Sequence, residues 1–294
     1  MDKKQSWWQT LFKAAVVGGT MTVPGASGGT MAMILGIYED LIGSVGGIFS
    51  HFRDSLCFLA LFCVGALAGM AALARGVLAL LERYPVVVSY FFLGAVAGGI
   101  PLIYRRAGIK KMTWQALFWP LAGLLIVYGL ALLPKELFTA GLAGGASAAD
   151  MPSLSHFLWQ LLGGCILAIA LILPGISVSQ MLLMLGLYEP VMEAVSTLKF
   201  ASLIPLGLGA VLCTLLFTRL LGNAMTRHPQ PTYLLILGFV LGSLGQLYPG
   251  QSQSGFFAWL LSGLPTGWEL FFAPLAAITG YQLLACLSRR ALQS

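Results

Sequence analysis

Long apolar stretches separated by short polar or glycine-rich breaks run along the whole chain. Several reach the roughly 20 residues that a helix needs to cross a hydrocarbon core of about 30 Å. In the stretch 56–81, for example, Arg75 is the only charged residue. The pattern predicts an all-α integral membrane protein, with helical segments at residues 8–22, 30–49, 56–81, 86–104, 113–133, 154–173, 181–198, 201–222, 232–248 and 268–287.

The composition agrees with this pattern. The mean hydropathy is +0.88 and only 9% of the residues are charged, whereas a soluble domain carries about 25%. The net charge of +6 comes from basic residues that flank apolar segments, and they form no patch with interleaved aromatics, so we expect no nucleic-acid partner. The cysteines and histidines show no metal-ligand spacing. We therefore predict neither a metal site nor a cofactor.

One short motif occurs twice. The windows 24–39 and 174–189 share eight of sixteen residues, and both interrupt apolar sequence with proline and glycine. The match continues further along the chain, where Arg219 corresponds to Arg75. Interrupted hydrophobic segments at matching positions of two halves indicate the binding site of a transporter. We predict two re-entrant tips, at 24–30 and 174–180.

Basic residues indicate which side of the membrane each loop faces. They cluster near both ends of the chain and at Arg105, Arg106, Lys110 and Lys111. The positive-inside bias places these clusters and both termini in the cytoplasm. With that assignment, the first two predicted helices dip into the membrane from one side, and the sixth and seventh dip in from the other.

The predicted fold therefore has two inverted-topology repeats. Each repeat has a re-entrant helix pair plus two transmembrane helices, with additional connecting and C-terminal transmembrane helices. This is the architecture of alternating-access carriers. The predicted regions are a first repeat (1–112), a linking helix and external loop (113–153), a second repeat (154–249), and a C-terminal loop and helix (250–294).

The tips carry small and hydroxyl-bearing residues. Non-helical backbone within a membrane must be buried in protein or face a water-filled cavity, and a helix that begins there points unpaired N–H groups at its surroundings. Such helix N-termini favour anions such as phosphate. A purely structural hairpin is the alternative. The candidate phosphate ligands are Ser27, Gly28, Gly29, Thr30, Ser177 and Ser179.

Arg75 and Arg219 are the second candidate feature. An arginine within a membrane helix costs roughly 2.5–3.5 kcal/mol on insertion scales, and usually faces a cavity or a partner. Each lies eight residues before another arginine, about 12 Å deeper at 1.5 Å per residue. Guanidinium matches phosphate oxygens bidentately, so we predict that both bind the head group. The alternative, stronger for Arg219, is that the side chain snorkels to the interface.

Glu39 and Glu189 are matched acids that follow the tips. A carboxylate near a conducting cavity can carry a proton or bind a cation, which makes them candidates for ion coupling. The alternative is an interfacial acid at the far end of the hairpin. No sequence feature distinguishes proton coupling, sodium coupling and passive exchange.

These motifs resemble those of the polyprenyl-phosphate transporter family. The resemblance rests on residues 24–30 and 35–39 and on their counterparts 174–177 and 185–189, and it extends from about residue 13 to 248. It implies a bacterial cytoplasmic-membrane protein that returns the lipid carrier undecaprenyl phosphate from the outer to the inner leaflet. The second tip differs from the first, because Val178-Ser179-Gln180 stands where the first has Gly28-Gly29-Thr30.

Two other functions fit the same motifs. In a membrane phosphatase acting on a polyprenyl diphosphate, Ser27 or Ser177 would be a nucleophile that needs a general base within hydrogen-bond reach. No histidine lies near either tip, and the matched acids are twelve residues further on. We therefore predict no catalytic residue and no enzyme. The other function is a carrier of a small water-soluble anion, whose transport would not require a lipid tail.

Overall fold

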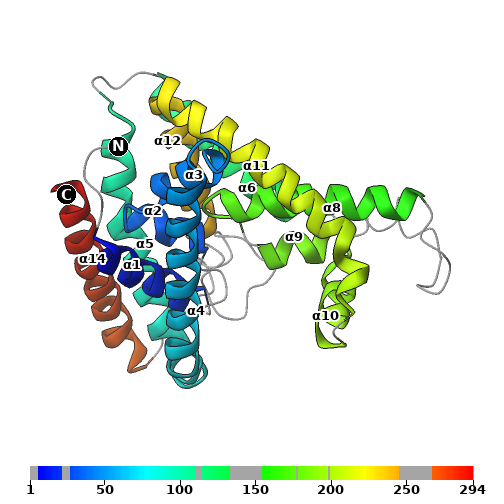
Figure 1. Ribbon diagram of the computed structural model, residues 1–294. Coiled ribbons are helices and arrows are strands. Elements are labelled where there is room, and N and C mark those ends of the chain that lie inside the picture. The colour runs from blue at the N-terminus through cyan, green and yellow to red at the C-terminus, as the bar shows by residue number, and fades with distance from the viewer. Residues whose placement is uncertain are drawn as a thin grey trace.

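A computed structural model describes residues 6–21, 27–109, 114–132, 154–176, 178–197, 199–244 and 267–293. Regular structure in these ranges is helical, as predicted (Figure 1). The first helices are α1 (Trp7–Thr20), α2 (Gly28–Ile34), α3 (Tyr38–Gly46), α4 (Phe52–Arg83), α5 (Pro85–Arg106) and α6 (Trp114–Leu132). They are followed by α8 (Leu154–Ile172), α9 (Val178–Met184), α10 (Tyr188–Ser196), the short 3-10 helix η1 (Phe200–Leu203), α11 (Ile204–Arg227), α12 (Pro229–Ser243) and α14 (Glu269–Gln293).

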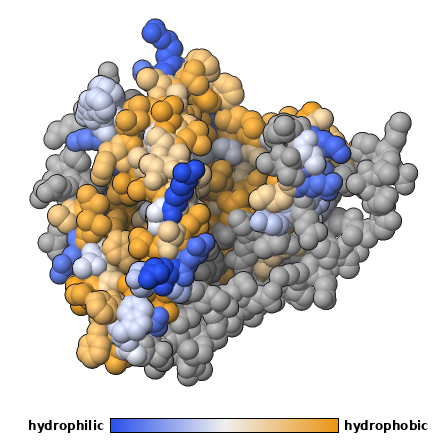
Figure 2. All heavy atoms as spheres, turned by 90° about the horizontal axis from the view of Figure 1, so that it is seen from below, coloured by the Kyte–Doolittle hydropathy of each residue, from blue (hydrophilic) through white to orange (hydrophobic). Residues whose placement is uncertain are grey.

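Within the described ranges, four helices are long and apolar enough to cross a membrane. They span Phe52–Arg83, Pro85–Arg106, Ala201–Arg227 and Glu269–Leu287, and two shorter apolar helices lie at Ala116–Leu130 and Phe157–Ile172. Large apolar side chains point outward from them. Leu67 on α4 is 66% exposed and Leu216 on α11 is 73% exposed, and apolar atoms dominate much of the described surface in Figure 2. Such a surface suits lipid, and the chain is a multi-pass membrane protein.

Each interrupted segment forms two short helices rather than one. We predicted a single helix over 30–49, but α2 ends at Ile34 and α3 begins at Tyr38. Gly36 between them has a φ of 67°, and Gly186 between α9 and α10 has a φ of 66°. A left-handed glycine ends a helix because it has no Cβ to clash. The bounds of α9 and α10 follow those of α2 and α3 at a constant spacing of 150 residues.

Glycines bring the helices of each half into close contact. Helices α1 and α4 run parallel, because Leu11 lies beside Gly65 and Ala15 lies beside Gly69. A side chain on Gly69 would place its first carbon 1.9 Å from the Ala15 carbonyl oxygen. In the second half, α8 packs on α11 in the matching way, with Leu161 beside Gly209. Small residues let membrane helices approach backbone to backbone.

Helices α6 and α14 pack across the molecule. Helix α6 follows α5 in the chain but packs on α12, where Gly238 lies against Pro120. Helix α14 follows α12 but packs on α5, where Gly94 lies against Ala277. Each helix that follows one half therefore packs on the other half.

A shared motif accompanies this crossed packing. Trp114, Phe118, Pro120, Leu121 and Ala122 recur 154 residues later as Trp268, Phe272, Pro274, Leu275 and Ala276. We had treated the two segments only as linking and terminal helices, so the motif was a missed signal.

The core lies where the two halves meet. Its largest cluster of buried side chains combines Ile34 of α2, Ile37, Ile103 of α5 and Leu234 of α12. Helices α3 and α11 also pack against each other. Helices α8 to α10 extend to one side of this core (Figure 1).

Candidate functional site

The two predicted tips, one just before α2 and one just before α9, lie against each other; we call them the first and second break. A methyl group on Gly29 would lie 3.4 Å from Pro174 Cα, which puts the backbone of the first break against that of the second. The buried Tyr38 hydroxyl donates a hydrogen bond of 2.6 Å to the Ile172 carbonyl. Ile172 is the last residue of α8, where carbonyls lack partners within the helix. A side chain of the first half thus caps a helix of the second half at the second break.

The first break carries an unpaired hydroxyl. Thr30 is 2% exposed, and its Oγ1 has no hydrogen-bond partner among the described residues. Ser27 is the N-cap residue of α2, but its side chain forms no capping hydrogen bond. Gly28 and Gly29 are half-buried beside it. A buried polar group without a partner costs about 1–3 kcal/mol, so the Thr30 hydroxyl suits a ligand that would satisfy it.

The second break is shaped by Gly175. Its φ is 85°, and a side chain there would come within 2.2 Å of the Phe239 carbonyl oxygen on α12. Ser177 lies outside the described residues, and so do the side chains of Ser179 and Glu189. Residues 24–26 of the first tip also lie outside them.

The two predicted arginines lie on exposed faces of their helices. Arg219 Nε donates a hydrogen bond of 3.0 Å to the Gly46 carbonyl at the end of α3, and its guanidinium carbon lies 5.5 Å from the centre of the Phe49 ring. Arg75 lies on α4, and the parallel register of α1 and α4 places it level with Met21, just before the first break. Within the described residues, no hydrogen bond joins either arginine to Ser27 or Thr30.

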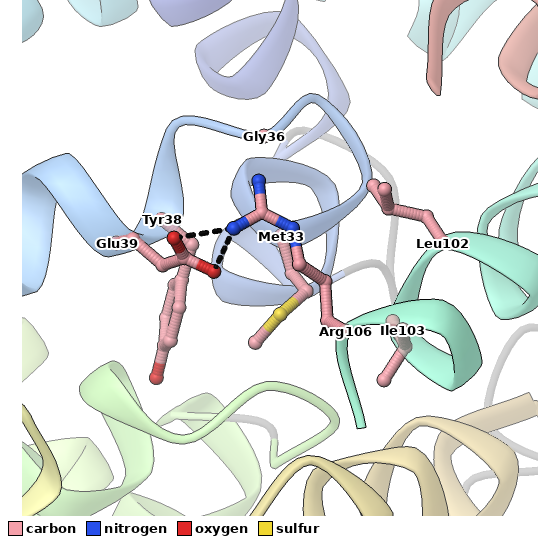
Figure 3. A pocket seen from close by; sticks show the side chains of 7 residues that line it. All are labelled: Met33, Gly36, Tyr38, Glu39, Leu102, Ile103 and Arg106. Atoms are coloured by element: carbon pink, nitrogen blue, oxygen red, sulfur yellow. Dashed lines mark hydrogen bonds and ion pairs between the residues drawn. The ribbon is translucent and has the colours of Figure 1, made fainter. Parts of the chain in front are cut away.

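Glu39 belongs to a cluster that the sequence did not predict. Arg106 Nη1 at the end of α5 lies 2.6 Å from each carboxylate oxygen of Glu39, in the first turn of α3. The hydroxyl of Tyr233 on α12 donates a short hydrogen bond to the same carboxylate. Figure 3 shows the Glu39 and Arg106 side chains directed toward each other. The cluster therefore joins three helices from both halves.

A small hollow opens beside this cluster. Its wall combines the ion pair with apolar side chains, and the lining residues are Met33, Gly36, Tyr38, Glu39, Leu102, Ile103 and Arg106. The sequence contained no direct signal for the cluster. Arg106 served only as a topology marker, and it lies 67 residues from Glu39 in the chain.

Together, these features define a class of protein. A multi-pass helical membrane protein whose broken helices meet at their breaks has the arrangement of a membrane transporter with discontinuous helices. No cluster of three or more potential metal ligands occurs in the described ranges. The first break contains hydroxyl and backbone N–H groups, and the Glu39 cluster contains a guanidinium, and groups of these kinds bind anions in proteins.

Comparison with known proteins identifies the family. Residues 17–258 match the model of the undecaprenyl phosphate translocase-like family, and the chain belongs to this family. It is 31% identical to a polyprenyl-phosphate transporter of Staphylococcus aureus over 97% of this chain and 98% of that protein. It is 30% identical to a polyprenyl-phosphate transporter of Vibrio cholerae over 84% of this chain and 79% of that protein.

The matched names all denote transport, and none denotes an enzyme. The resemblance to the polyprenyl-phosphate transporter family is therefore confirmed. No solved structure matches the chain.

Proposed function

We propose that this protein is a flippase that returns undecaprenyl phosphate, or a similar polyprenyl phosphate, from the outer to the inner leaflet of the bacterial cytoplasmic membrane. Family membership supports the substrate class. The observation that carries the mechanism is the contact of the two breaks at Gly29 and Pro174, next to the Thr30 hydroxyl, which has no hydrogen-bond partner among the described residues. An isoprenoid tail can remain in lipid, so the protein needs a polar path only for the phosphate.

In the proposed path, the phosphate enters from outside near Arg75, is held at the tips, and leaves toward Arg219. Ser27, Gly28, Gly29 and Thr30 would hold it from the first tip, and Ser177 and Ser179 from the second. Helix N-termini and guanidinium groups both favour phosphate oxygens. The level of Arg75 beside the end of α1 supports a place for it near the first tip.

The proposed architecture is a pair of inverted repeats with both termini in the cytoplasm. Helix α1 has 14 residues, about 21 Å at 1.5 Å per residue, which is too short to cross a core of about 30 Å. This supports re-entry rather than crossing. The crossed packing of α6 and α14 supports a two-fold relation between the halves.

Transport against a gradient would require a coupling ion. Glu39 and Glu189 are the proposed sites for a proton or sodium ion. The support for Glu39 is its position between the two halves, bonded to Arg106 and Tyr233. Uncoupled exchange in both directions is the alternative, and a gradient experiment distinguishes the two.

The decisive experiment measures leaflet exchange of a polyprenyl phosphate by the purified protein in liposomes. Arg75→Ala and Arg219→Ala should each lower the exchange rate at least about tenfold, as expected for loss of a charge-assisted contact in lipid. The matched controls are Arg83→Ala and Arg227→Ala, which remove the same charge at the ends of the same helices. Exchange that accelerates under a pH gradient, and loses this response in Glu39→Gln, would support proton coupling.

Three results would overturn the proposal. Wild-type exchange no faster than in empty liposomes, with or without a gradient, would exclude a flippase. Release of inorganic phosphate from a polyprenyl diphosphate would instead identify the membrane phosphatase, with Ser27 or Ser177 as nucleophile. Transport of free phosphate at the rate of the lipid would identify the carrier of a small soluble anion.

A further inference from the structure

Arg106 uses only part of its binding capacity on Glu39. Both contacts to the carboxylate come from a single nitrogen, Nη1, whereas a guanidinium offers five N–H donors in a planar fork. Figure 3 shows the other terminal nitrogen directed away from Glu39. The side chains of Arg106 and Glu39 are 34% and 42% exposed. The guanidinium is therefore accessible to a second anion.

Buried apolar side chains surround the ion pair. Met33, Leu102 and Ile103 line the same hollow, and they are 5%, 3% and 1% exposed. Such an apolar wall strengthens the attraction between a guanidinium and an anion, and a hydrocarbon chain attached to the anion would remain in the surrounding lipid.

Glu39 is held in place from the other half of the molecule. Tyr233 is 5% exposed on α12 and donates its hydroxyl to the carboxylate. The Glu39 carboxylate thus lies between the buried Tyr233 hydroxyl of the second half and the accessible Arg106 guanidinium of the first half. If Arg106 released it, the carboxylate would keep the Tyr233 hydrogen bond.

We propose that Arg106 is an additional ligand for the phosphate head group, and that Glu39 is an internal anion that occupies Arg106 until the lipid arrives. The inference rests on the proposed function and adds a phosphate-binding site apart from the tips. A phosphate monoester presents more oxygen atoms and more negative charge than a carboxylate, and guanidinium binds it bidentately. The phosphate therefore displaces Glu39 from Arg106.

The test is a binding titration of the purified full chain in detergent with farnesyl phosphate, a short-chain probe. Arg106→Ala should weaken binding at least about tenfold, and Arg106→Lys should weaken it less because lysine keeps the charge but loses the fork. Glu39→Gln should tighten binding several-fold, because glutamine can accept the Tyr233 hydrogen bond but competes poorly for guanidinium. Arg105→Ala is the matched control, since it removes the neighbouring charge and should change affinity less than about twofold.

Further probes identify the source of the phosphate. Farnesyl phosphate should bind more tightly than both inorganic phosphate and farnesol. If inorganic phosphate binds as tightly as farnesyl phosphate, the site does not recognise a lipid. If farnesol binds as tightly, the site does not recognise phosphate. Thermal unfolding of each variant separates lost contacts from lost folding.

The outcomes also separate this inference from the proposed function. If wild type exchanges lipid in liposomes but Arg106→Ala binds like Arg105→Ala, the pair is only structural and the inference fails alone. If Glu39→Gln weakens the binding of farnesyl phosphate or leaves it unchanged, Glu39 does not compete with phosphate for Arg106, and the inference also fails. If wild type neither exchanges lipid nor binds the probe, the proposed function fails with it.

Discussion

In the first half of the chain, α1 packs along α4 with Leu11 beside Gly65, and in the second half α8 packs along α11 with Leu161 beside Gly209. The residues of the Glu39 cluster, in contrast, do not all recur in both halves. The carboxylate of Glu39 binds Arg106 and Tyr233, but at the repeat spacing of 144 residues a serine, Ser89, stands where the second half has Tyr233. The halves therefore share a packing scaffold that small residues define, and they differ in the side chains that bind charge. The Glu39 cluster therefore marks a place where the two halves differ in function.

The largest expected effect tests the shared scaffold. Gly69→Val and Gly164→Val should each abolish the yield of folded protein, because their first side-chain carbons would lie 1.9 Å and 2.0 Å from backbone carbonyl oxygens of α1 and α11. Overpacking by even a few methylenes costs about 1–3 kcal/mol, and this overlap is with rigid backbone. The measurement is monodisperse yield after detergent extraction. Gly76→Val and Gly207→Val are the matched controls, since neither would meet an atom within 4 Å. Equal yields for all four variants would contradict the packing.

The next effect compares the two breaks. Gly175→Ala should destabilise the protein by more than about 1–2 kcal/mol, the cost of a left-handed conformation alone, because its methyl would also approach the Phe239 carbonyl oxygen. Gly29→Ala is the counterpart in the first break and should cost less, since its methyl would lie at ordinary contact distance, 3.4 Å from Pro174. Thermal unfolding in detergent measures both. A larger loss for Gly29→Ala would reverse the ranking that the structure predicts.

A smaller effect tests the contact between the halves. Tyr38→Phe should cost about 1–3 kcal/mol, because it leaves the buried Ile172 carbonyl without its donor. Tyr188→Phe changes the matching residue, which is only half-buried, and should cost under about 0.5 kcal/mol. Unfolding midpoints of the two variants provide the comparison. If both shift equally, the hydrogen bond contributes nothing specific to the first half.

The smallest effect on stability concerns Thr30. Thr30→Val keeps the shape and removes a buried hydroxyl that has no partner among the described residues. The free energy of unfolding should stay unchanged or rise by up to about 1 kcal/mol. Lipid exchange should nevertheless fall, because the hydroxyl would no longer bind phosphate. A stability loss without any change in exchange would indicate a purely structural threonine.

The sequence was sufficient for the long helices and for the two places, near residues 24–30 and 174–180, where a new helix begins. It did not predict the interruptions at Gly36 and Gly186, each of which lies inside one predicted helix, 30–49 or 181–198. The correct predictions depend on local patterns, namely apolar length and the residues Pro24 and Pro174. The contact of the two breaks did not follow from those patterns. It depends on how the halves dock, which no local pattern specifies.

The cluster at Glu39 was also beyond sequence reasoning. Glu39 meets Arg106 across 67 residues and Tyr233 across 194 residues. The repeat gave no indication of the cluster, because Tyr233 has no tyrosine counterpart in the first half. A search for matched residues favours what the halves share, and so it selects against residues that make them different.

The packing of α14 on α5 has a consequence for synthesis. Gly94 and Gly98 of α5 receive the backbone of α14, which the ribosome makes more than 160 residues later. At about 5–20 residues per second, α5 waits on the order of ten seconds for its partner. Helix α12, in contrast, emerges when α6 is already in place. The first half is therefore completed last, and until then its glycine face is open to lipid, to the insertion machinery or to a neighbouring chain.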